Sequence, residues 1–298
     1  GDPGSEESKA LRKGFMTVLA VYRDTVINSY YGDRAAVIQY PISNTSWAAP
    51  QPADEGYRAA YSVDADGNDI FDSSMNDEQK YDAALKAAVT FFEKAGYTFD
   101  ADGKVASAPA GAPESCEILI PGNGKQDHPT YGIATAASKA LETIGIKLTV
   151  NDVGSSVWNN ALEGNTAQMW VAAWQSTADP DMYQVYHKDS KATSVLNWGY
   201  KQILNDTTDK YMTERDLINE LSELIDKARK TETQSVRKRD YKEALDIVME
   251  LAVELPTYQR SDLYAYNQNK IDASTFTPDG ELSPYKGLTS RIADISLM

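Results

Sequence analysis

Two closely spaced carboxylates, Asp179 and Asp181 on either side of Pro180, have the clearest potential for chemistry in this chain. Such a pair could act as general acid and general base in a hydrolytic reaction, for instance in a glycosidase. The two residues could equally cap a helix that begins near Met182. An aspartate at a helix start accepts hydrogen bonds from the free amides and interacts favourably with the positive end of the helix dipole. No histidine or third acid stands at a supporting spacing, so the sequence favours capping over catalysis.

Two glycine-containing runs resemble ligand loops but fit them poorly. Gly122–Lys125 has neither the spacing of a P-loop nor a serine or threonine after the lysine, which favours a tight strand-to-helix turn. Asp64–Asn68 begins like a calcium loop, but Asp69 and Met75 stand where that loop needs glycine and glutamate. We expect a turn at both places, and a second acidic turn at Asp100–Lys104.

The chain offers few residues for thiol or imidazole chemistry. Cys116 is the only cysteine, so the chain can form neither an internal disulfide nor a thiolate zinc site. Its place at the start of an apolar run predicts a buried, unreactive thiol. His128 and His187 are the only histidines and stand far apart. We therefore expect no metal, no cofactor and no enzymatic activity.

Aromatic residues are the unusual feature of the same region. Trp170 and Trp174 lie four apart in a predicted strand, 168–174, so they would point to one face. Trp198 and Tyr200 follow in a predicted loop. These rings could pack in the core, or they could line a binding cleft, where flat amphipathic rings add contact area at low entropic cost.

The elements that would position these residues alternate between strand and helix. The alternation is carried by residues 117–120, 129–144, 147–153, 155–163 and 168–174. Such an order predicts a parallel sheet with right-handed crossovers. Ligands of parallel α/β sheets bind beyond the carboxyl ends of the strands, so we expect 122–125 and 175–181 to share one ligand-facing edge.

Helical periodicity dominates the rest of the chain. It predicts helices over residues 8–30, ending near Gly32, and 78–95, and two amphipathic helices containing Leu217–Ile225 and Tyr241–Leu251. Residues 105–114 are predicted as a loop and 257–266 as a strand after Pro256.

Composition limits the classes of partner. The chain has 298 residues, of which 42% are hydrophobic, so it can bury a sizeable core. A net charge of -15 disfavours binding to nucleic acid or to an anionic membrane. The sequence contains no apolar run long enough to span a bilayer and no visible signal peptide, although a removed export signal or an upstream domain stays open.

Two motifs resemble a known family. The chain reads Trp-Gln-Ser-Thr-Ala-Asp-Pro-Asp-Met-Tyr over Trp174–Tyr183, and Asn-Trp-Gly-Tyr over Asn197–Tyr200. There it resembles the oligopeptide- and dipeptide-binding proteins of ABC importers, the extracellular solute-binding proteins of family 5. Weaker similarities follow the same order as in the family and are carried by Lys9–Phe15, Tyr22–Asp24, Phe91–Gly96, Asp102–Lys104, Arg237, Tyr241, Ala244, Leu255, Pro256 and Tyr258.

The resemblance implies an α/β fold, namely one lobe of the periplasmic-binding-protein-like type II fold, with a mixed, mostly parallel sheet flanked by helices. Residues 1–266 would form the second, C-terminal lobe of a two-lobed protein. Residues 267–298 would form a tail that returns to a first lobe, which comes earlier in family members.

The resemblance also implies a function. A monomeric extracytoplasmic protein, either a cell-surface lipoprotein or periplasmic, would capture a peptide or other small solute and deliver it to ABC permease subunits. The positions that would lie on the cleft side are Trp174, Ser176, Thr177, Asp179, Trp198 and Tyr200.

One departure from the family pattern bears on the ligand. In the oligopeptide binders an aspartate between the tryptophan and the proline holds the amino terminus of the peptide. In this chain the interval is one residue shorter, and Ser176 and Thr177 fill the nearest places. Asp179 could take over that role, or the ligand could lack a free amine. A sugar, nickel or haem ligand, and a surface sensory or adhesion module, therefore remain alternatives.

Overall fold

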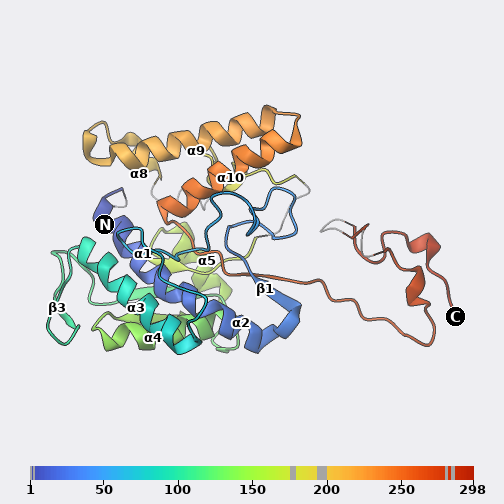
Figure 1. Ribbon diagram of the computed structural model, residues 1–298, viewed down its shortest axis with the longest axis horizontal. Coiled ribbons are helices and arrows are strands. Elements are labelled where there is room, and N and C mark those ends of the chain that lie inside the picture. The colour runs from blue at the N-terminus through green and yellow to red at the C-terminus, as the bar shows by residue number, and fades with distance from the viewer. Residues whose placement is uncertain (1, 3, 175–178, 193–199, 279–280, 283–285) are drawn as a thin grey trace.

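The computed structural model describes residues 2, 4–174, 179–192, 200–278, 281–282 and 286–298. The chain builds an α/β body of two layers, and the residues beyond Ser261 leave this body as an extended arm (Figure 1). Each layer has its own cluster of buried hydrophobic side chains.

A three-stranded parallel sheet of order β5-β4-β6 organises one layer. The central strand β4 (Cys116–Ile120) pairs with β5 (Leu148–Asp152) and with β6 (Met169–Trp170). Helices α4 (Pro129–Thr143) and α5 (Ser155–Glu163) form the crossovers that parallel pairing requires. The predicted α/β fold with a mostly parallel sheet flanked by helices is confirmed.

Strand β6 is shorter than the sequence predicts. It ends at Trp170 and not at Trp174, although the amide of Val171 still donates to the carbonyl of Leu119 at 3.0 Å. Leu119 faces β6, whereas the Ile120 carbonyl faces the β5 side and accepts from Val153. The next residue on the β6 side is Pro121, which has no amide hydrogen with which to continue the ladder. Trp170 and Trp174 therefore do not share a strand face, and that prediction is wrong.

The predicted helix over 8–30 is two helices, α1 (Glu6–Val21) and α2 (Arg23–Tyr31), which ends at Gly32 as expected. The break lies where the buried Arg23 donates to the carbonyl of Ala20 at 3.0 Å and to carbonyls of two other segments. A short 3-10 turn, Gly32–Arg34, follows.

Helix α3 (Asp77–Lys94) packs against α1 and begins with a capping box between Asn76 and Gln79. Phe15 of α1 meets Phe92 of α3 edge to face, with ring centroids 5.4 Å apart. These helices and α4 enclose the core on the sheet, which includes Val18, Leu19, Ala88, Ile118, Ile120, Ile133 and Leu141.

A small hairpin of β2 (Thr98–Phe99) and β3 (Val105–Ser107) follows α3. Its turn is the predicted one at Asp100, whose side chain accepts from the amides of Asp102 and Lys104. Residues 105–114 were predicted as a loop, and the strand pairing of Val105–Ser107 corrects this. The predicted turn at Asp64 is confirmed by similar hydrogen bonds from Asp66 and Asn68.

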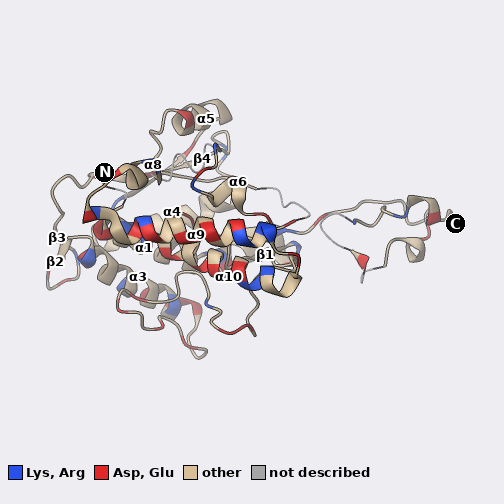
Figure 2. Ribbon diagram, turned by 90° about the horizontal axis from the view of Figure 1, so that it is seen from above, with Lys and Arg blue, Asp and Glu red and all other residues tan. Residues whose placement is uncertain are grey.

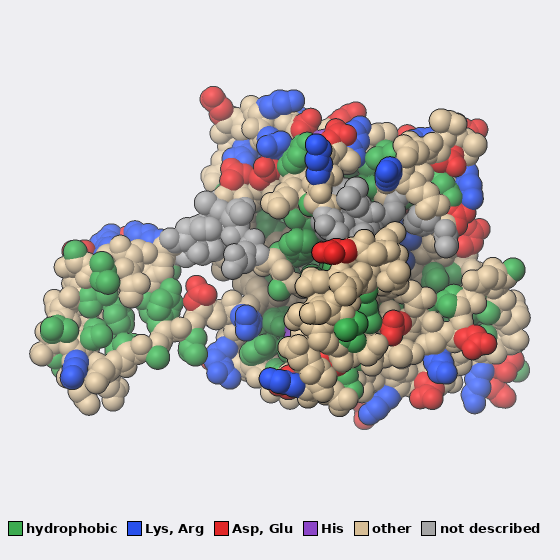
Figure 3. All heavy atoms as spheres, turned by 180° about the vertical axis from the view of Figure 1, so that it is seen from behind, with side chains coloured by type: hydrophobic (Ala, Val, Ile, Leu, Met, Phe, Trp, Pro, Cys, Tyr) green, Lys and Arg blue, Asp and Glu red, His purple; other side chains and the backbone are tan. Residues whose placement is uncertain are grey.

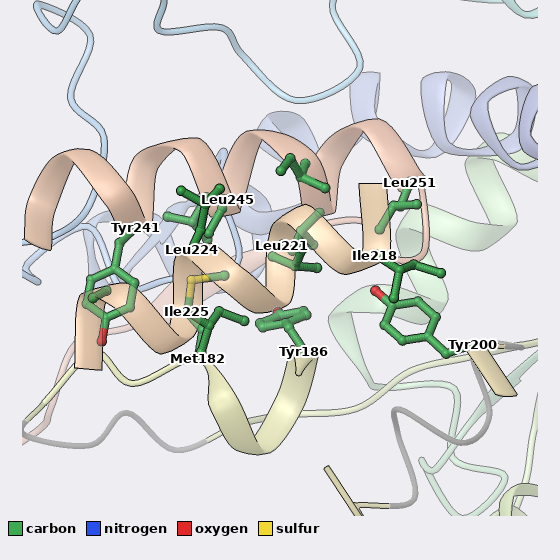
Figure 4. Close-up of a cluster of buried hydrophobic side chains, with 14 of the residues drawn as sticks. Met182, Tyr186, Tyr200, Ile218, Leu221, Leu224, Ile225, Tyr241, Leu245 and Leu251 are labelled. Atoms are coloured by element: carbon green, nitrogen blue, oxygen red, sulfur yellow. The ribbon is translucent and has the colours of Figure 1, made fainter. Parts of the chain in front are cut away.

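The second layer is helical. Helices α9 (Met212–Lys230) and α10 (Gln234–Leu251) form a hairpin, and the shorter α6 (Tyr183–Tyr186) and α8 (Tyr200–Asn205) pack against its buried side. A 3-10 turn, Asp209–Tyr211, leads into α9. Figure 4 shows the buried side chains, which include Met182, Tyr186, Ile218, Leu221, Ile225, Tyr241, Leu245 and Leu251. Acidic and basic residues cover the outer face of α9 (Figure 2).

Polar contacts and a short antiparallel pair join the two layers. Arg12 of α1 donates at 3.0 Å to the carbonyls of Leu251 and Ala252, where α10 ends. Strand β1 (Ala35–Val37) pairs with β7 (Tyr258–Arg260), so the strand predicted over 257–266 is real but much shorter.

The arm carries the last residues away from the body to a small unit, whose described residues include the 3-10 turns Ala273–Thr275 and Ile292–Asp294. An isolated bridge joins Ile271 to Leu297. Figure 3 shows apolar side chains gathered on the surface of this unit. None of the helices in the described part of the chain is both long and apolar enough to cross a bilayer.

Candidate ligand-binding site

The carboxyl edge of the parallel sheet carries the turns that were expected to face a ligand. We call the residues Gly122–Lys125, Val153–Gly154 and Val171–Trp174 the rim. The amide of Asn123 donates to the carbonyl of Val153 at 2.9 Å, which joins the turn after β4 to the turn after β5. The prediction named 122–125 and 175–181 as the segments on this edge. The parallel pairing of β4 with β6 places the ends of both strands on one edge, but residues 175–178 lie outside the described residues.

Backbone amides of the turn that begins at Gly122 donate to groups within the protein. The amide of Lys125 donates to the Gly122 carbonyl at 3.3 Å, and that of Gln126 to the Asp152 side chain at 2.7 Å. A Cβ at Gly122 would lie 2.5 Å from Asp152 Oδ1, so only glycine fits there. Because the amides are occupied internally, the structure supports a tight turn and not a phosphate cradle.

Aromatic side chains lie at and beside the rim. Trp158 of α5 meets Trp170 of β6 edge to face, with ring centroids 6.2 Å apart. Trp174 is 55% exposed, and Val157 beside Trp158 is 56% exposed. Sequence reasoning missed Trp158, although its helix starts at the carboxyl end of β5 and so had to begin at this same edge.

Asp179 and Asp181 are both held by arginines of the α9–α10 hairpin. Both carboxylate oxygens of Asp179 lie close to Arg237 Nη2, at 2.7 and 2.8 Å. Asp181 Oδ2 lies 3.1 Å from Arg229 Nε, while its Oδ1 accepts from the amide of Tyr183 at 2.9 Å. Asp181 thus binds the amide of the first residue of α6, although the N-cap residue of that helix is Met182, and Asp179 forms an ion pair instead.

The guanidinium groups of Arg237 and Arg229 lie over aromatic rings. The Arg237 guanidinium lies 5.3 Å from the ring centroid of Trp47 and 5.6 Å from that of Tyr241, and Tyr241 also receives a hydrogen bond from it at 3.3 Å. The Arg229 guanidinium lies 4.4 Å from the ring centroid of Tyr183. The hydrogen bond to Asp179 raises the pKa of Arg237.

The six residues expected on the cleft side do not form one group. Trp174 is exposed at the rim, and Asp179 is ion-paired. Tyr200 is only 2% exposed and packs in the helical core, so its placement on an open cleft is wrong. As the first residue of α8 it turns inward with that helix (Figure 4). The other three, Ser176, Thr177 and Trp198, lie outside the described residues.

Residues 8–194 match the family model of bacterial extracellular solute-binding proteins, family 5, middle region. The chain belongs to this family. No curated protein matches the sequence in a direct comparison.

Solved structures of similar fold agree with the family. The oligopeptide-binding protein AppA from Bacillus subtilis, in complex with a nonapeptide, has a TM-score of 0.60 at 16% identity and covers 97% of this chain and 47% of its own. NikZ from Campylobacter jejuni, in complex with Ni(L-His), has a TM-score of 0.58 at 17% identity, with coverages of 95% and 48%. The chain therefore spans about half the length of these solved proteins.

Outside the rim, two titratable side chains of this family 5 chain have pKa values that burial shifts. Cys116 is half-buried and not fully buried as predicted, and its partial burial raises the pKa of the thiol. His128 accepts from the amide of Thr130 at 3.1 Å as the N-cap of α4, and burial lowers its pKa. Within the described ranges, no group of three or more His, Cys, Asp or Glu side chains is placed to hold a metal.

One buried acid was not singled out from the sequence. Glu254 follows α10, and its Oε1 accepts from the Tyr186 hydroxyl at 2.5 Å. The Tyr61 hydroxyl donates to the carbonyl of the same residue at 2.7 Å. Burial raises the pKa of Glu254 to about 7. No periodic pattern could have indicated this residue, because it lies in an irregular segment between the two layers.

Proposed function

We propose that residues 1–266 are the second, ligand-capturing lobe of a two-lobed, peptide-type solute-binding protein that serves an ABC importer. Membership of the family supports the solute-binding role. The observation that carries the proposal is the group of aromatic side chains at and beside the rim, namely Trp158, Trp170 and Trp174, at the carboxyl edge of a parallel sheet. Aromatic rings at such an edge suit the closure of a second lobe over a ligand.

The proposed ligand contacts are Trp174, Ser176, Thr177, Asp179 and Trp198, to which the structure leads us to add Trp158. The ion pairs at Asp179 and Asp181 argue against their use as a catalytic pair, because a general acid or base must be free to exchange a proton with substrate. A binding role accounts for the site better than an enzymatic one.

Residues 267–298 are proposed to return to the first lobe. Leu297 and Met298 are 79% and 80% exposed at the end of the arm, and Ile292 is 73% exposed. An open concavity of about 370 Å³ between Tyr266, Phe276 and Ile295 adds to this apolar surface. Apolar area of this kind is normally covered in the assembled protein, which fits packing against a neighbouring lobe.

The cellular setting follows from the same proposal. The protein would work outside the cytoplasm, as a lipoprotein or in the periplasm, as a monomer that hands its solute to permease subunits. A net charge of -15 argues against nucleic acid as a partner.

Calorimetry on the full-length gene product tests the proposal. Titration with random pentapeptide pools should release or absorb heat, whereas the isolated chain 1–298 should bind weakly because half of the contacts are absent. Heat with nickel, haem or a sugar, together with silence for peptides, would show that the peptide assignment is wrong. A gene neighbourhood without permease or ATPase genes would favour the sensory or adhesion alternative.

A further inference from the structure

Asn123 and Gly124, in the turn after β4, form the only Asn-Gly pair in the sequence. In such a pair the backbone nitrogen of the glycine can attack the side-chain amide of the asparagine, because glycine has no Cβ to obstruct the approach. Asparagine is a thermolabile residue in proteins for chemical reasons of this kind. The reaction needs a solvent-exposed side chain, room for the peptide to rotate and a glycine amide that is not engaged elsewhere.

The turn leaves this pair open to solvent and free to rotate. Both residues are exposed, and both have positive φ, 58° at Asn123 and 73° at Gly124. Apart from its chain neighbours, no atom lies within 4 Å of the place that a Cβ on Gly124 would occupy. The peptide that joins the two residues can therefore rotate without displacing a packed side chain.

The amide of Gly124, which would attack, has no hydrogen-bond partner among the residues that the structure describes. The amides on either side of it do have partners. Asn123 donates to the carbonyl of Val153 at 2.9 Å, and Lys125 donates to that of Gly122 at 3.3 Å. The attacking nitrogen can thus turn toward the side chain without giving up a hydrogen bond of its own.

Two Asp-Gly pairs, which can form the same cyclic imide, differ at this amide. In the acidic turns, Gly67 follows Asp66 and Gly103 follows Asp102. The amides of these glycines donate to the carbonyls three residues earlier, at 3.1 and 3.0 Å. Their nitrogens are therefore held away from the preceding side chain.

Asn165 provides a closer comparison with Asn123. It is also exposed and also has a positive φ, 52°. The amide that follows it, on Thr166, donates to the carbonyl of Ala161 at 2.9 Å. Exposure and backbone conformation are thus alike at the two asparagines, whereas the next amide is bound at Asn165 and not at Asn123.

We propose that Asn123 is a site of spontaneous deamidation, at which the nitrogen of Gly124 closes a succinimide that water opens to aspartate or isoaspartate. A bond forms from this nitrogen to Cγ of Asn123, the Cγ–Nδ2 bond breaks, and the amide proton leaves with Nδ2 as ammonia. Water then adds to either carbonyl of the ring and breaks its bond to the ring nitrogen. The reaction needs no ligand, so it goes beyond the proposed function.

The conversion places a negative charge on the rim. Asn123 Oδ1 lies 3.8 Å from the place that a Cβ on Gly154 would occupy. Gly154 is the N-cap residue of α5, a helix without a side-chain cap. A carboxylate at this place interacts favourably with the positive end of the helix dipole. The charge of the edge that we propose to face a ligand thus changes with the age of the protein.

The experiment incubates the chain 1–298 at neutral pH, in buffer and in urea, and follows the products with time. Ion-exchange chromatography separates the acidic species, and the variant Asn123→Asp marks where the product elutes. Peptide mapping by mass spectrometry then gives the rate at each site, and labelling with isoaspartyl methyltransferase identifies isoaspartate. The rate in urea divided by the rate in buffer is the protection that the fold gives each site, which removes the effect of local sequence.

In buffer, an acidic species should form and elute with Asn123→Asp, and the peptide containing Asn123 should carry the change. The protection should be at least about fivefold smaller at Asn123 than at Asn165, because the Thr166 amide must give up a hydrogen bond before it attacks. Isoaspartate at the two Asp-Gly pairs should be suppressed by the fold in the same manner. Asn123→Gln, whose longer side chain would have to close a larger ring, should abolish the acidic species.

Equal protection of Asn123 and Asn165, or conversion of Asn123 in urea only, would overturn the inference. An acidic species that forms in Asn123→Gln as fast as in the wild type would overturn it as well, because another residue would then be its source. None of these measurements involves a solute, so a negative result leaves the proposed function untouched, and a failure of the proposed function leaves the deamidation site in place.

Discussion

Glu254 makes the stability of the protein depend on pH. Its pKa is raised to about 7 in the folded state, so between about pH 4.5 and 7 the unfolded state releases this proton while the folded state keeps it. Its contribution to the free energy of unfolding should therefore be full below pH 4.5 and fall by up to about 3 kcal/mol as pH rises to 7. Urea unfolding of wild type and Glu254→Gln across this range should show the wild type losing stability relative to the variant. Glu243→Gln, on the exposed side of α10, should show no such change.

Arg12 fixes the end of α10 to α1. It donates to the carbonyls of Leu251 and Ala252, which no later turn of helix can satisfy because the chain leaves α10 there. Arg12→Met should lower the free energy of unfolding by about 2–4 kcal/mol, since two buried carbonyls lose their partner. Lys13→Met, which removes only the pair with the half-exposed Glu250, should cost under about 1 kcal/mol by the same measurement.

At the scale of elements, the α9–α10 hairpin gives a direct test of how the core is packed. Leu221 is fully buried between the helices, whereas Leu217, one turn earlier, is only partly buried. Leu221→Ala should cost about 2–5 kcal/mol of unfolding free energy because it leaves a cavity. Leu217→Ala should cost clearly less, and equal losses for both would contradict the difference in burial between the two side chains.

Helix periodicity predicted the elements better than it predicted their ends. The apolar residues of α3, α4, α9 and α10 recur at helical spacing, so the sequence alone revealed these helices. The break at Tyr22 was missed because it depends on Arg23, which binds carbonyls of segments far away in the sequence. Local periodicity carries no information about such partners.

The site was harder to predict than the fold for the same reason. The sequence indicated the edge near which Trp174 lies, since strand order alone places strand ends together. It could not show that Arg237 would pair with Asp179, or that Tyr200 would turn into the core. Both facts depend on how the helical layer docks on the sheet layer.

At the scale of the whole molecule, the arm tests whether the chain works as one lobe of a larger protein. Residues 267–298 form their described backbone hydrogen bonds within the arm, for example from Met298 to Lys270 and from Asp272 to Ser296. Replacing the exposed Ile292 and Leu297 with Asp should therefore change the unfolding free energy of chain 1–298 by less than about 1 kcal/mol.

The same two substitutions should act strongly in the full-length protein if the arm packs on a first lobe. Burying two carboxylates in an apolar contact is costly, so the lobes should uncouple, and a single thermal transition should separate into two. Lys270→Glu, which changes charge at an exposed site without touching the apolar residues, serves as the control and should keep one transition. One unchanged transition in the double variant would mean that the arm is not what joins the lobes, because a buried contact could not tolerate both charges.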